Sequence, residues 1–348
     1  MADHVRLKDI AEAANVSVSC VERYLNQSGY VSAEKRGRIE DAIKETGYIP
    51  NRTARTLRGQ KSKLIGHIRT YAEDNRMFNK LAMELDNQAY QMGYLVIDMV
   101  YKQEDGIQEL KNKITALLGY QVDAIIFSCC VDTKYTGDIQ HILYDFLSRL
   151  PIPVIMMERA FDIYSVNKVF VDYKEGSFNA TKKLIEAGHK DIAYLGKKTD
   201  LPVEKERLQG FLEAMEAENL PVNREKRLIL VDDYHIQDGC MGMEKFLETE
   251  PYPTAIFTAS DIFASAAVRT LTKHKLRIPD DMSIVGYDDT YAEVLTPPIS
   301  TMRLPFQEMV RNALKIVAEN GKNGEKKSGQ TIIISPEYIE RESVKRIS

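Results

Sequence analysis

From Lys63 onward the sequence alternates between short apolar runs of strand length and amphipathic runs of helix length. The apolar runs include "KLIGHIR" (63–69) and "YLVIDMV" (94–100), and "FNKLAMELDNQAYQMG" (78–93) between them has a helical pattern. Apolar strands separated by helices are typical of parallel sheets that are covered on both faces. The sequence therefore predicts an α/β fold with doubly wound parallel sheets.

The same alternation restarts near residue 165 and continues to "QTIIIS" (330–335). A chain of 348 residues is too long for one ordinary core. We therefore expect two lobes, each built on its own sheet. Ligands of doubly wound sheets bind beyond the carboxyl ends of the strands, so a cleft between the lobes is the expected ligand site.

The first 46 residues have a different pattern, that of three short helices, over residues 7–14, 17–26 and 32–46. Ser17 and Ser32 are expected to cap the second and third helices. Two short helices across a tight turn, braced by a third, form the helix-turn-helix plan. A generic three-helix bundle is the alternative.

Charge is distributed unevenly along the chain. Residues 1–63 carry 12 basic and 8 acidic residues, a surplus of four positive charges in a chain whose net charge is −4. A basic head on an acidic body suggests that the head alone meets an anionic partner. Within the basic segment 48–63, the stretch "NRTARTLR" (51–58) has one strongly apolar residue, Leu57, so the segment is expected to be a linker that orders only on a partner.

The sequence resembles the LacI/GalR family of bacterial transcription regulators over nearly its whole length. "LKDIAEAANVSV" and the segment around "GYIPN" resemble that family's head and hinge, while "GHKDIAYLG", "RLQGF", "TAIFTASD", "SIVGYDD", "PPISTMRLP" and "PEYIERES" resemble its effector core. The resemblance implies a two-lobed core of periplasmic-binding-protein type behind an all-α helix-turn-helix head and a hinge helix. The expected divisions are 1–49 for the head, 50–62 for the hinge helix and linker, 63–161 plus 293–327 for the N-terminal lobe, and 162–292 plus 328–348 for the C-terminal lobe.

The resemblance also implies a function. A protein of this kind acts as a homodimer on double-stranded operator DNA, and a small molecule in the interlobe cleft controls its DNA affinity. We expect a repressor whose effector is a sugar or a sugar derivative, with no catalytic residue, cofactor or metal. The end of the sequence lacks leucine heptads, which favours a dimer over a tetramer.

The second helix is expected to lie in the major groove, with Val21 and Leu25 turned toward the head's core. Arg23 on its outward face suits a bidentate contact to guanine, the alternative being a solvated surface arginine. The resemblance makes Leu57 a wedge between base pairs in the minor groove, the alternative being a linker residue. The expected DNA-binding residues are Arg6, Val18, Ser19, Glu22, Arg23, Asn26, Asn51, Arg55, Leu57 and Arg58.

In the core, the resemblance makes Arg207 of "RLQGF" and Asp288 of "GYDD" an effector-binding pair. A guanidinium and a carboxylate that face one cleft can grip hydroxyls or polar edges. Two alternatives stay open: Asp288 or Asp289 caps the following turn, and Arg159 forms a salt bridge between the lobes. The expected effector-binding residues are Tyr71, Arg76, Phe78, Glu158, Arg207, Ser260 and Asp288.

The head departs from the family pattern at four positions. Arg6 stands where a threonine usually caps the first helix, Cys20 and Glu22 replace threonine and serine, and Tyr24 replaces a small aliphatic residue. Ionised Glu22 would be repelled by phosphates. Either it accepts a hydrogen bond from cytosine, or it sits at the groove edge beside a basic neighbour such as Arg6 and lowers non-specific affinity, which we favour.

Other classes of protein are weaker alternatives. The sequence has no G-x-S-x-G, Walker, G-x-G-x-x-G or H-E-x-x-H motif, which argues against an α/β enzyme. The signal-free N-terminus and the intact hinge argue against a sugar-binding protein without DNA function. The N-terminus has no apolar signal segment, so we expect a cytoplasmic protein, on the nucleoid when it is bound to DNA. The four cysteines have no metal spacing and are expected to be buried apolar residues.

Overall fold

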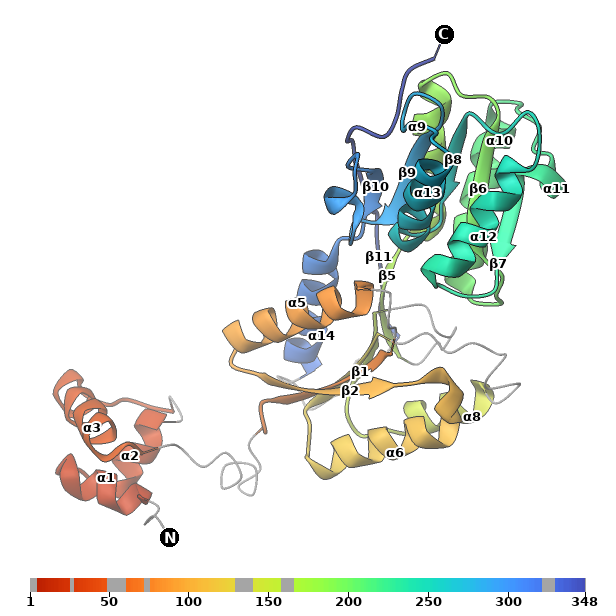
Figure 1. Cartoon of the computed structure of the whole chain (residues 1–348). Coiled ribbons are helices and arrows are strands. Elements are labelled where there is room, and N and C mark those ends of the chain that lie inside the picture. Colours follow the sequence, from red (N-terminus) through yellow and green to blue (C-terminus); the bar gives the residue numbers. More distant parts are fainter. Residues whose placement is uncertain are drawn as a thin grey trace. The chain divides into compact units, whose positions relative to one another are not determined.

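The computed structural model describes residues 5–25, 28–48, 61–71, 76–128, 140–157, 166–320 and 329–347. The chain divides into two compact units, residues 1–62 and residues 63–348. Each unit is described by itself (Figure 1). In the part of the chain that is described, no helix has the length and apolar character needed to cross a membrane.

The first unit is the expected head of three helices around a small apolar core. Ile10, Val21 and Ile39 contribute one fully buried side chain from each helix. The backbone N–H of Lys35 donates to Ser32 Oγ at 3.4 Å, which caps the third helix as expected. The helices are α1 (Leu7–Ala13), α2 (Val18–Leu25) and α3 (Ala33–Thr46).

The second unit contains two sheets of six strands. The first sheet has the order β11-β5-β4-β3-β1-β2, and all its pairs are parallel. Alternate residues of its strands pack on opposite faces: Ile65 and Ile126 pack with α5 and α14, and Ile68 and Phe127 with α6 and α8. Its elements are β1 (Leu64–Thr70), α5 (Met77–Gln91), β2 (Leu95–Tyr101), η1 (Gln103–Asp105), α6 (Gly106–Gly119), β3 (Ala124–Ser128), α8 (Gln140–Ser148), β4 (Val154–Met156), β5 (Asn167–Val171), α14 (Phe306–Asn320) and β11 (Thr331–Ile334).

The second sheet has the order β12-β10-β9-β8-β6-β7 and is parallel except for β12, which runs antiparallel to β10. Helices α9 and α10 pack against each other on one face, and α12 and α13 pack on the other (Figure 1). Its elements are α9 (Tyr173–Glu186), β6 (Ile192–Lys197), α10 (Pro202–Ala217), α11 (Arg224–Arg227), β7 (Leu228–Val231), α12 (Ile236–Leu247), β8 (Ala255–Thr258), α13 (Asp261–Lys273), β9 (Ser283–Asp288), η3 (Ala292–Val294), β10 (Ser300–Arg303) and β12 (Glu337–Ile339).

The predicted α/β class with two parallel sheets is confirmed, but three strands lie in the sheet opposite to the expected one. Strands β5 and β11 belong to the first sheet, although the expected ranges 162–292 and 328–348 placed them in the C-terminal lobe. Strand β10 belongs to the second sheet, although 293–327 placed it in the N-terminal lobe. The chain crosses to the other sheet directly after each of these three strands. Each strand is therefore paired within the sheet that the chain is about to leave.

Candidate functional site

Helix α2 presents the face that the sequence predicted. Val18 is 39% exposed, Ser19 and Arg23 are exposed and Glu22 is half-buried, whereas Val21 is fully buried. The Arg23 Nε donates to the backbone oxygen of Ser19 at 3.2 Å, so the guanidinium lies along the helix it belongs to. The helical spacing thus gathers the expected base-reading side chains on one accessible surface.

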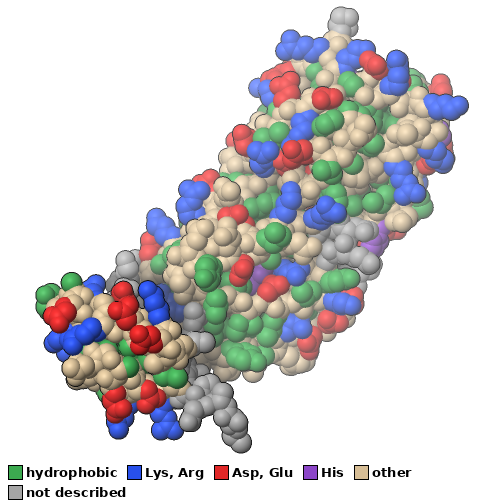
Figure 2. Space-filling view, turned by 60° about the vertical axis from the view of Figure 1, so that its left-hand side comes forward, with side chains coloured by type: hydrophobic (Ala, Val, Ile, Leu, Met, Phe, Trp, Pro, Cys, Tyr) green, Lys and Arg blue, Asp and Glu red, His purple; other side chains and the backbone are tan. Residues whose placement is uncertain are grey.

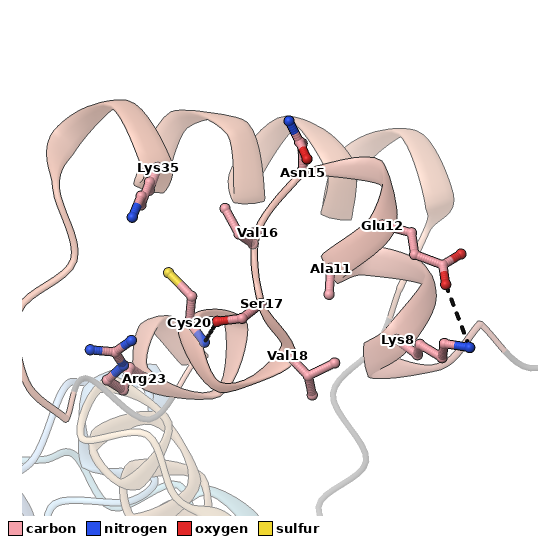
Figure 3. A pocket seen from close by; sticks show the side chains of 10 residues that line it. All are labelled: Lys8, Ala11, Glu12, Asn15, Val16, Ser17, Val18, Cys20, Arg23 and Lys35. Carbon is pink, nitrogen blue, oxygen red and sulfur yellow. Dashed lines mark hydrogen bonds and ion pairs between the residues drawn. The ribbon is translucent and has the colours of Figure 1, made fainter.

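A shallow hollow of about 630 Å³ lies beside the amino end of α2. Lys8, Arg23 and Lys35 line it, together with Glu12, whose carboxylate lies 3.6 Å from the Lys8 ammonium (Figure 3). Ser17 Oγ accepts from the backbone N–H of Cys20 at 3.3 Å and caps the helix at this point. Cations around a helix amino end suit phosphate oxygens.

Lys8 and Lys35 were not among the expected DNA-binding residues. They stand on α1 and at the start of α3, and only the packing of the three helices brings them beside Arg23. Elsewhere on the surface, basic and acidic side chains are mixed over the view in Figure 2.

Three of the four departures from the family pattern, Arg6, Cys20 and Tyr24, have different structural consequences. The backbone N–H of Arg6 donates to Asp9 Oδ2 at 2.6 Å, which closes the start of α1. Cys20 is buried in the head's core. Tyr24 donates its hydroxyl to Glu40 at 2.9 Å and so ties α2 to α3, while burial and that carboxylate raise the pKa of the Tyr24 hydroxyl. Several residues named from the sequence lie outside the described residues: Asn26, Asn51, Arg55, Leu57, Arg58, Cys129, Cys130, Glu158 and Arg159.

The second candidate site is centred on Arg207 of α10, whose side chain is almost fully buried. Its NH2 donates to Asp288 Oδ1 at 2.8 Å, at the end of β9, and its NH1 donates to the backbone oxygen of Ala259 at 2.6 Å. NH1 also donates to Glu204 Oε1 at 3.2 Å, one helical turn earlier. The predicted Arg207–Asp288 pair is therefore present, and Glu204 joins it.

Aromatic rings enclose this group. The Arg207 guanidinium lies 4.8 Å from the ring centre of Tyr173 and 4.5 Å from that of Tyr287. The ring of Tyr234 stacks on Phe263 with centres 5.1 Å apart, and its hydroxyl donates to Glu204 Oε1. Flat apolar faces beside fixed polar groups are the usual make-up of a small-molecule site.

The surroundings of Arg207 and Tyr234 raise the pKa of both side chains. Burial alone would lower the pKa of Arg207, but Asp288 and Glu204 raise it well above its ordinary value. Burial raises the pKa of Tyr234 well above its ordinary value, and the Glu204 carboxylate adds to the effect. Arg207 is therefore a permanent cation here, and Tyr234 stays a hydrogen-bond donor.

Polar atoms without a hydrogen-bond partner gather at this site. Among the described residues, Glu204 Oε2, Arg207 Nε and Ser260 Oγ are buried and have none. Ser260 precedes α13 and its side chain makes no capping bond to that helix. Buried polar groups are almost always paired in native proteins, so this group of unpaired atoms marks the surroundings of Arg207 as a candidate ligand site.

The loop after β9 carries Asp288 and is held by a buried carboxylate. Asp261 accepts from the backbone N–H of Thr290 at 2.6 Å and of Tyr291 at 3.1 Å, and from Thr301 Oγ1 at 2.8 Å. Burial raises the pKa of Asp261 to about 6. Asp261 therefore caps this turn, a task that the sequence alternative gave to Asp288 or Asp289.

Asp289 has a separate structural role. It accepts from Arg303 Nε at 2.7 Å and from Arg341 NH2 at 2.8 Å. Its backbone oxygen accepts from Lys80 Nζ of α5 at 2.9 Å. Asp288 and Asp289 both have positive φ angles, 97° and 55°, and these contacts hold that unusual backbone in place. The loop is thereby fixed with Asp288 turned toward Arg207.

The three expected effector-binding residues of the N-terminal lobe that the structure describes lie in different surroundings. The Arg76 guanidinium lies 4.7 Å from the ring centre of Tyr291, so it reaches the loop after β9. Phe78 is 5% exposed and packs in the core under α5. Tyr71 is 47% exposed, and Lys102 lies 5.0 Å from its ring centre. Arg76 thus contacts the loop that carries Asp288.

A serine, a histidine and an aspartate also line up within the first sheet. His67 Nε2 lies 2.6 Å from Ser128 Oγ, and His67 Nδ1 lies 2.8 Å from Asp98 Oδ1, although its N–H is poorly aimed at that oxygen. His67 and Ser128 are fully buried, and Asp98 also accepts from Arg69 Nε at 2.8 Å. A hydrolytic serine must be exposed to its substrate, so we interpret this group as a polar network within the sheet.

Sequence reasoning missed Glu204, Tyr234 and Tyr173. Glu204 carried a usable signal, because a residue three positions before Arg207 lies on the same helix face. Tyr173 and Tyr234 carried none, since they come from distant segments that only the fold brings together. Among the described residues there is no cluster of His, Cys, Asp and Glu that could hold a metal.

Comparisons with known proteins agree with this arrangement. Residues 6–51 match the model of bacterial regulatory proteins of the lacI family, and residues 181–344 match that of a periplasmic binding protein-like domain. The chain is 30% identical over 344 residues to the HTH-type transcriptional repressor PurR of Actinobacillus pleuropneumoniae serotype 3, covering 98% of this chain and 99% of the relative. It is 31% identical over 345 residues to the repressor of the same name from Haemophilus influenzae, with the same coverage.

Solved structures give the same result for the fold. The lac repressor dimer bound to operator and the anti-inducer ONPF superposes with a TM-score of 0.80 at 24% identity, covering 98% of this chain and 99% of that one. The complex of the transcriptional regulator CelR with cellobiose gives a TM-score of 0.67 at 24% identity, covering 97% and 99%.

Proposed function

This chain belongs to the LacI family of bacterial transcription regulators and is a transcriptional repressor, and on that basis we propose that a small molecule held around Arg207 and Asp288 controls its affinity for operator DNA. It acts on double-stranded operator DNA as a homodimer and is not an enzyme. We propose further that the effector is a sugar or a sugar derivative, and that the lobes move relative to each other when it binds.

One observation carries the proposal for the effector site. Three buried polar atoms without a partner, on Glu204, Arg207 and Ser260, lie beside a stacked aromatic pair. Hydroxyl groups both donate and accept, so a polyhydroxylated ligand can satisfy all three atoms. Tyr71, Arg76, Phe78 and Glu158 remain proposed contacts from the other lobe.

A thermal-shift screen tests the effector site. Sugars, sugar phosphates, nucleobases and amino acids are each added to the full-length protein. A true effector at 100 times its Kd adds about 2.7 kcal/mol of stability, which is measurable as a rise in Tm. The same compound should fail to raise the Tm of Asp288→Asn. A compound that stabilises both proteins equally would bind elsewhere and would remove this site from the proposal.

For DNA binding we propose that α2 enters the major groove with Val18, Ser19 and Arg23 toward the bases and with Glu22 at the groove edge. Arg23 is exposed and lines the hollow with Lys8 and Lys35. Residues 1–49 would form the head and residues 50–62 the hinge. Phosphate and minor-groove contacts are proposed for Arg6, Asn26, Asn51, Arg55, Leu57 and Arg58.

Arg23→Ala tests this docking. It should weaken operator binding by roughly 1–3 kcal/mol and relax preference at one base pair. Equal losses on operator and on random DNA would mean that Arg23 contacts phosphate instead.

A further inference from the structure

The two ends of α2 are held in different ways. At the amino end, Ser17 Oγ accepts from the backbone N–H of Cys20 at 3.3 Å, and Cys20 and Val21 are buried in the head's core. At the carboxyl end, Tyr24 and Leu25 are only half-buried. The core therefore fixes the first turn of this eight-residue helix more firmly than the last turn, which carries Arg23.

Tyr24 adds a restraint at the carboxyl end of α2. Its ring packs against the head's core, and its hydroxyl donates to Glu40 Oε1 of α3 at 2.9 Å. The backbone of α3 is anchored at this point, because Ile39, the neighbour of Glu40, is fully buried. The hydrogen bond therefore joins the carboxyl end of α2 to a fixed acceptor on the next helix.

The direction of Arg23 depends on this restraint, because Tyr24 follows it directly in the helix. Arg23 is exposed, while Tyr24 reaches α3. A rotation of α2 by about 10° moves a side-chain end that lies ~6 Å from the helix axis by about 1 Å. A bidentate contact to a base needs two short hydrogen bonds at once, so such a shift breaks it. A phosphate contact depends mainly on charge and tolerates the shift.

We propose that Tyr24 is a positioning residue for operator recognition: its hydrogen bond to Glu40 sets the rotation of α2 and so directs Arg23 at a base edge. This rests on the proposed docking of α2 in the major groove. The family pattern has a small aliphatic residue at this position, and such a side chain has no group that donates to Glu40. An exposed hydrogen bond contributes little to stability, so the bond acts mainly on geometry.

The first test is Tyr24→Phe in the full-length protein, which keeps the ring and removes the donor. The probes are a duplex that the wild type selects from a randomised pool and a shuffled duplex of the same composition. Their Kd values are measured by fluorescence anisotropy, well below the Tm of the variant.

Tyr24→Phe should lose at least ~5-fold of the preference for the selected duplex, while its Kd for the shuffled duplex changes less than ~2-fold. An unchanged preference, with or without a lower Tm, would overturn the proposal, because the hydroxyl would then at most stabilise the head.

Glu40→Gln and Glu40→Ala separate the hydrogen bond from the charge. Both variants remove one negative charge, which tightens binding to both duplexes, so preference and not affinity is the readout. Glu40→Gln keeps an oxygen that accepts from Tyr24 and should retain the preference, whereas Glu40→Ala should lose it as Tyr24→Phe does. Equal preferences in the two variants would contradict a role for the bond. Glu45→Ala is the matched control, because it removes the same charge from the exposed last turn of α3 and should leave the preference unchanged.

Combining Tyr24→Phe with Glu40→Ala tests whether the two residues act through one bond. The double variant should lose no more preference than either single variant does. Losses that add would mean that the two residues act separately, which is incompatible with the proposal.

The last test distinguishes this proposal from the docking on which it rests. The selected duplex is substituted one base pair at a time, and Tyr24→Phe should relax the preference at the same base pair as Arg23→Ala. If Arg23→Ala relaxes a preference that Tyr24→Phe leaves intact, α2 is docked as proposed and the positioning role is wrong. If Arg23→Ala leaves every preference intact, the docking itself fails, whatever Tyr24→Phe does.

Discussion

Asp261 is the residue on which the geometry of the effector loop depends. Its buried carboxyl accepts from the backbone N–H groups of Thr290, Tyr291 and Ala292 and from the Thr301 hydroxyl, at 2.6 to 3.3 Å. These bonds place the turn that presents Asp288 to Arg207. Burial makes the Asp261 carboxyl hard to ionise, so the stability of the loop depends on pH.

The first prediction concerns that dependence. Burial raises the pKa of Asp261 to about 6, and the charge of Asp289 adds to the effect. An unfolded aspartate has a pKa of about 3.9. The folded chain therefore binds more protons in this window, and the stability that Asp261 contributes falls as the pH rises from about 4 to about 6.

Asp261→Asn removes this titration. The free energy of unfolding of the wild type minus that of the variant should fall by on the order of 3 kcal/mol between pH 4 and pH 7, measured by urea denaturation. A difference that stays flat, or that rises with pH, would show that Asp261 is ionised throughout.

The second prediction concerns Glu22, the acidic residue on the exposed face of α2. Glu22→Ser should tighten binding to operator and to random DNA alike, because the variant removes a charge that phosphates repel. The measurement is fluorescence anisotropy at several salt concentrations. Glu45→Ser, which removes the same charge from the last turn of α3, should change neither affinity appreciably.

Two other outcomes would lead to different conclusions about Glu22. Weaker operator binding of Glu22→Ser, with relaxed preference at one base pair, would mean that Glu22 accepts a hydrogen bond from cytosine. Such a contact contributes roughly 1–3 kcal/mol to discrimination against the wrong base. If neither affinity nor preference changes, Glu22 points to solvent and α2 is docked with a different rotation.

At the scale of residues, the family resemblance named Arg207 and Asp288 as a pair, because both belong to short motifs in the family's order, and the structure brings the two side chains to 2.8 Å. It did not identify Tyr173, Tyr234 or the capping role of Asp261. Those roles depend on contacts between segments that are tens of residues apart, such as Asp261 with Thr290 and Thr301. Residue types and spacing contain no information on such contacts.

At the scale of elements, helices α9 and α10 approach so closely that only glycine fits at their crossing. A Cβ added to Gly210 would lie 2.2 Å from the backbone oxygen of Lys174 and 2.9 Å from the backbone nitrogen of Phe178. Backbone atoms cannot move aside as a flexible side chain can. The crossing also sets the position of Arg207, one turn away from Gly210 on α10.

The third prediction uses this crossing. Gly210→Ala should destabilise the core unit by several kcal/mol, since the helices must separate, and it should weaken effector binding as well. Gly119→Ala is the control, because a Cβ there would meet no atom within 4 Å and its helix α6 should gain about 0.5–1 kcal/mol. Denaturant unfolding of both variants decides; equal stabilities would contradict the close approach.

Most helices and strands were predictable as elements, since each has the apolar period of its type. The sheet that a strand joins was not always predictable. Strands β5, β10 and β11 each stand where the chain changes sheet, and their apolar residues suit either one. Hydrogen-bond pairing to β4, β9 and β5 respectively decides the matter, and that pairing is a property of the fold.

At the scale of the whole molecule, the protein combines a head that has an exposed hollow lined by Lys8, Arg23 and Lys35 with a core that has a buried polar site. Regulation requires that ligand in the core changes DNA binding by the head. The contacts of Lys80 with Asp289 and of Arg76 with Tyr291 connect α5 to the loop that carries Asp288. Through these contacts, ligand binding at Arg207 and Asp288 can change the position of α5 in the N-terminal lobe. A ligand can shift such an equilibrium only by its differential affinity for the two states.

The most direct test is the Kd of full-length protein for its operator, measured by fluorescence anisotropy with and without the compound that the thermal-shift screen identifies. The effector should change the operator Kd at least ~5-fold while leaving the Kd for random DNA unchanged, a coupling of about 1 kcal/mol or more. Asp288→Asn should bind operator like the unliganded wild type whether or not the compound is present. An operator Kd that does not respond to the compound, or one that responds equally in Asp288→Asn, would contradict control of DNA binding through this site.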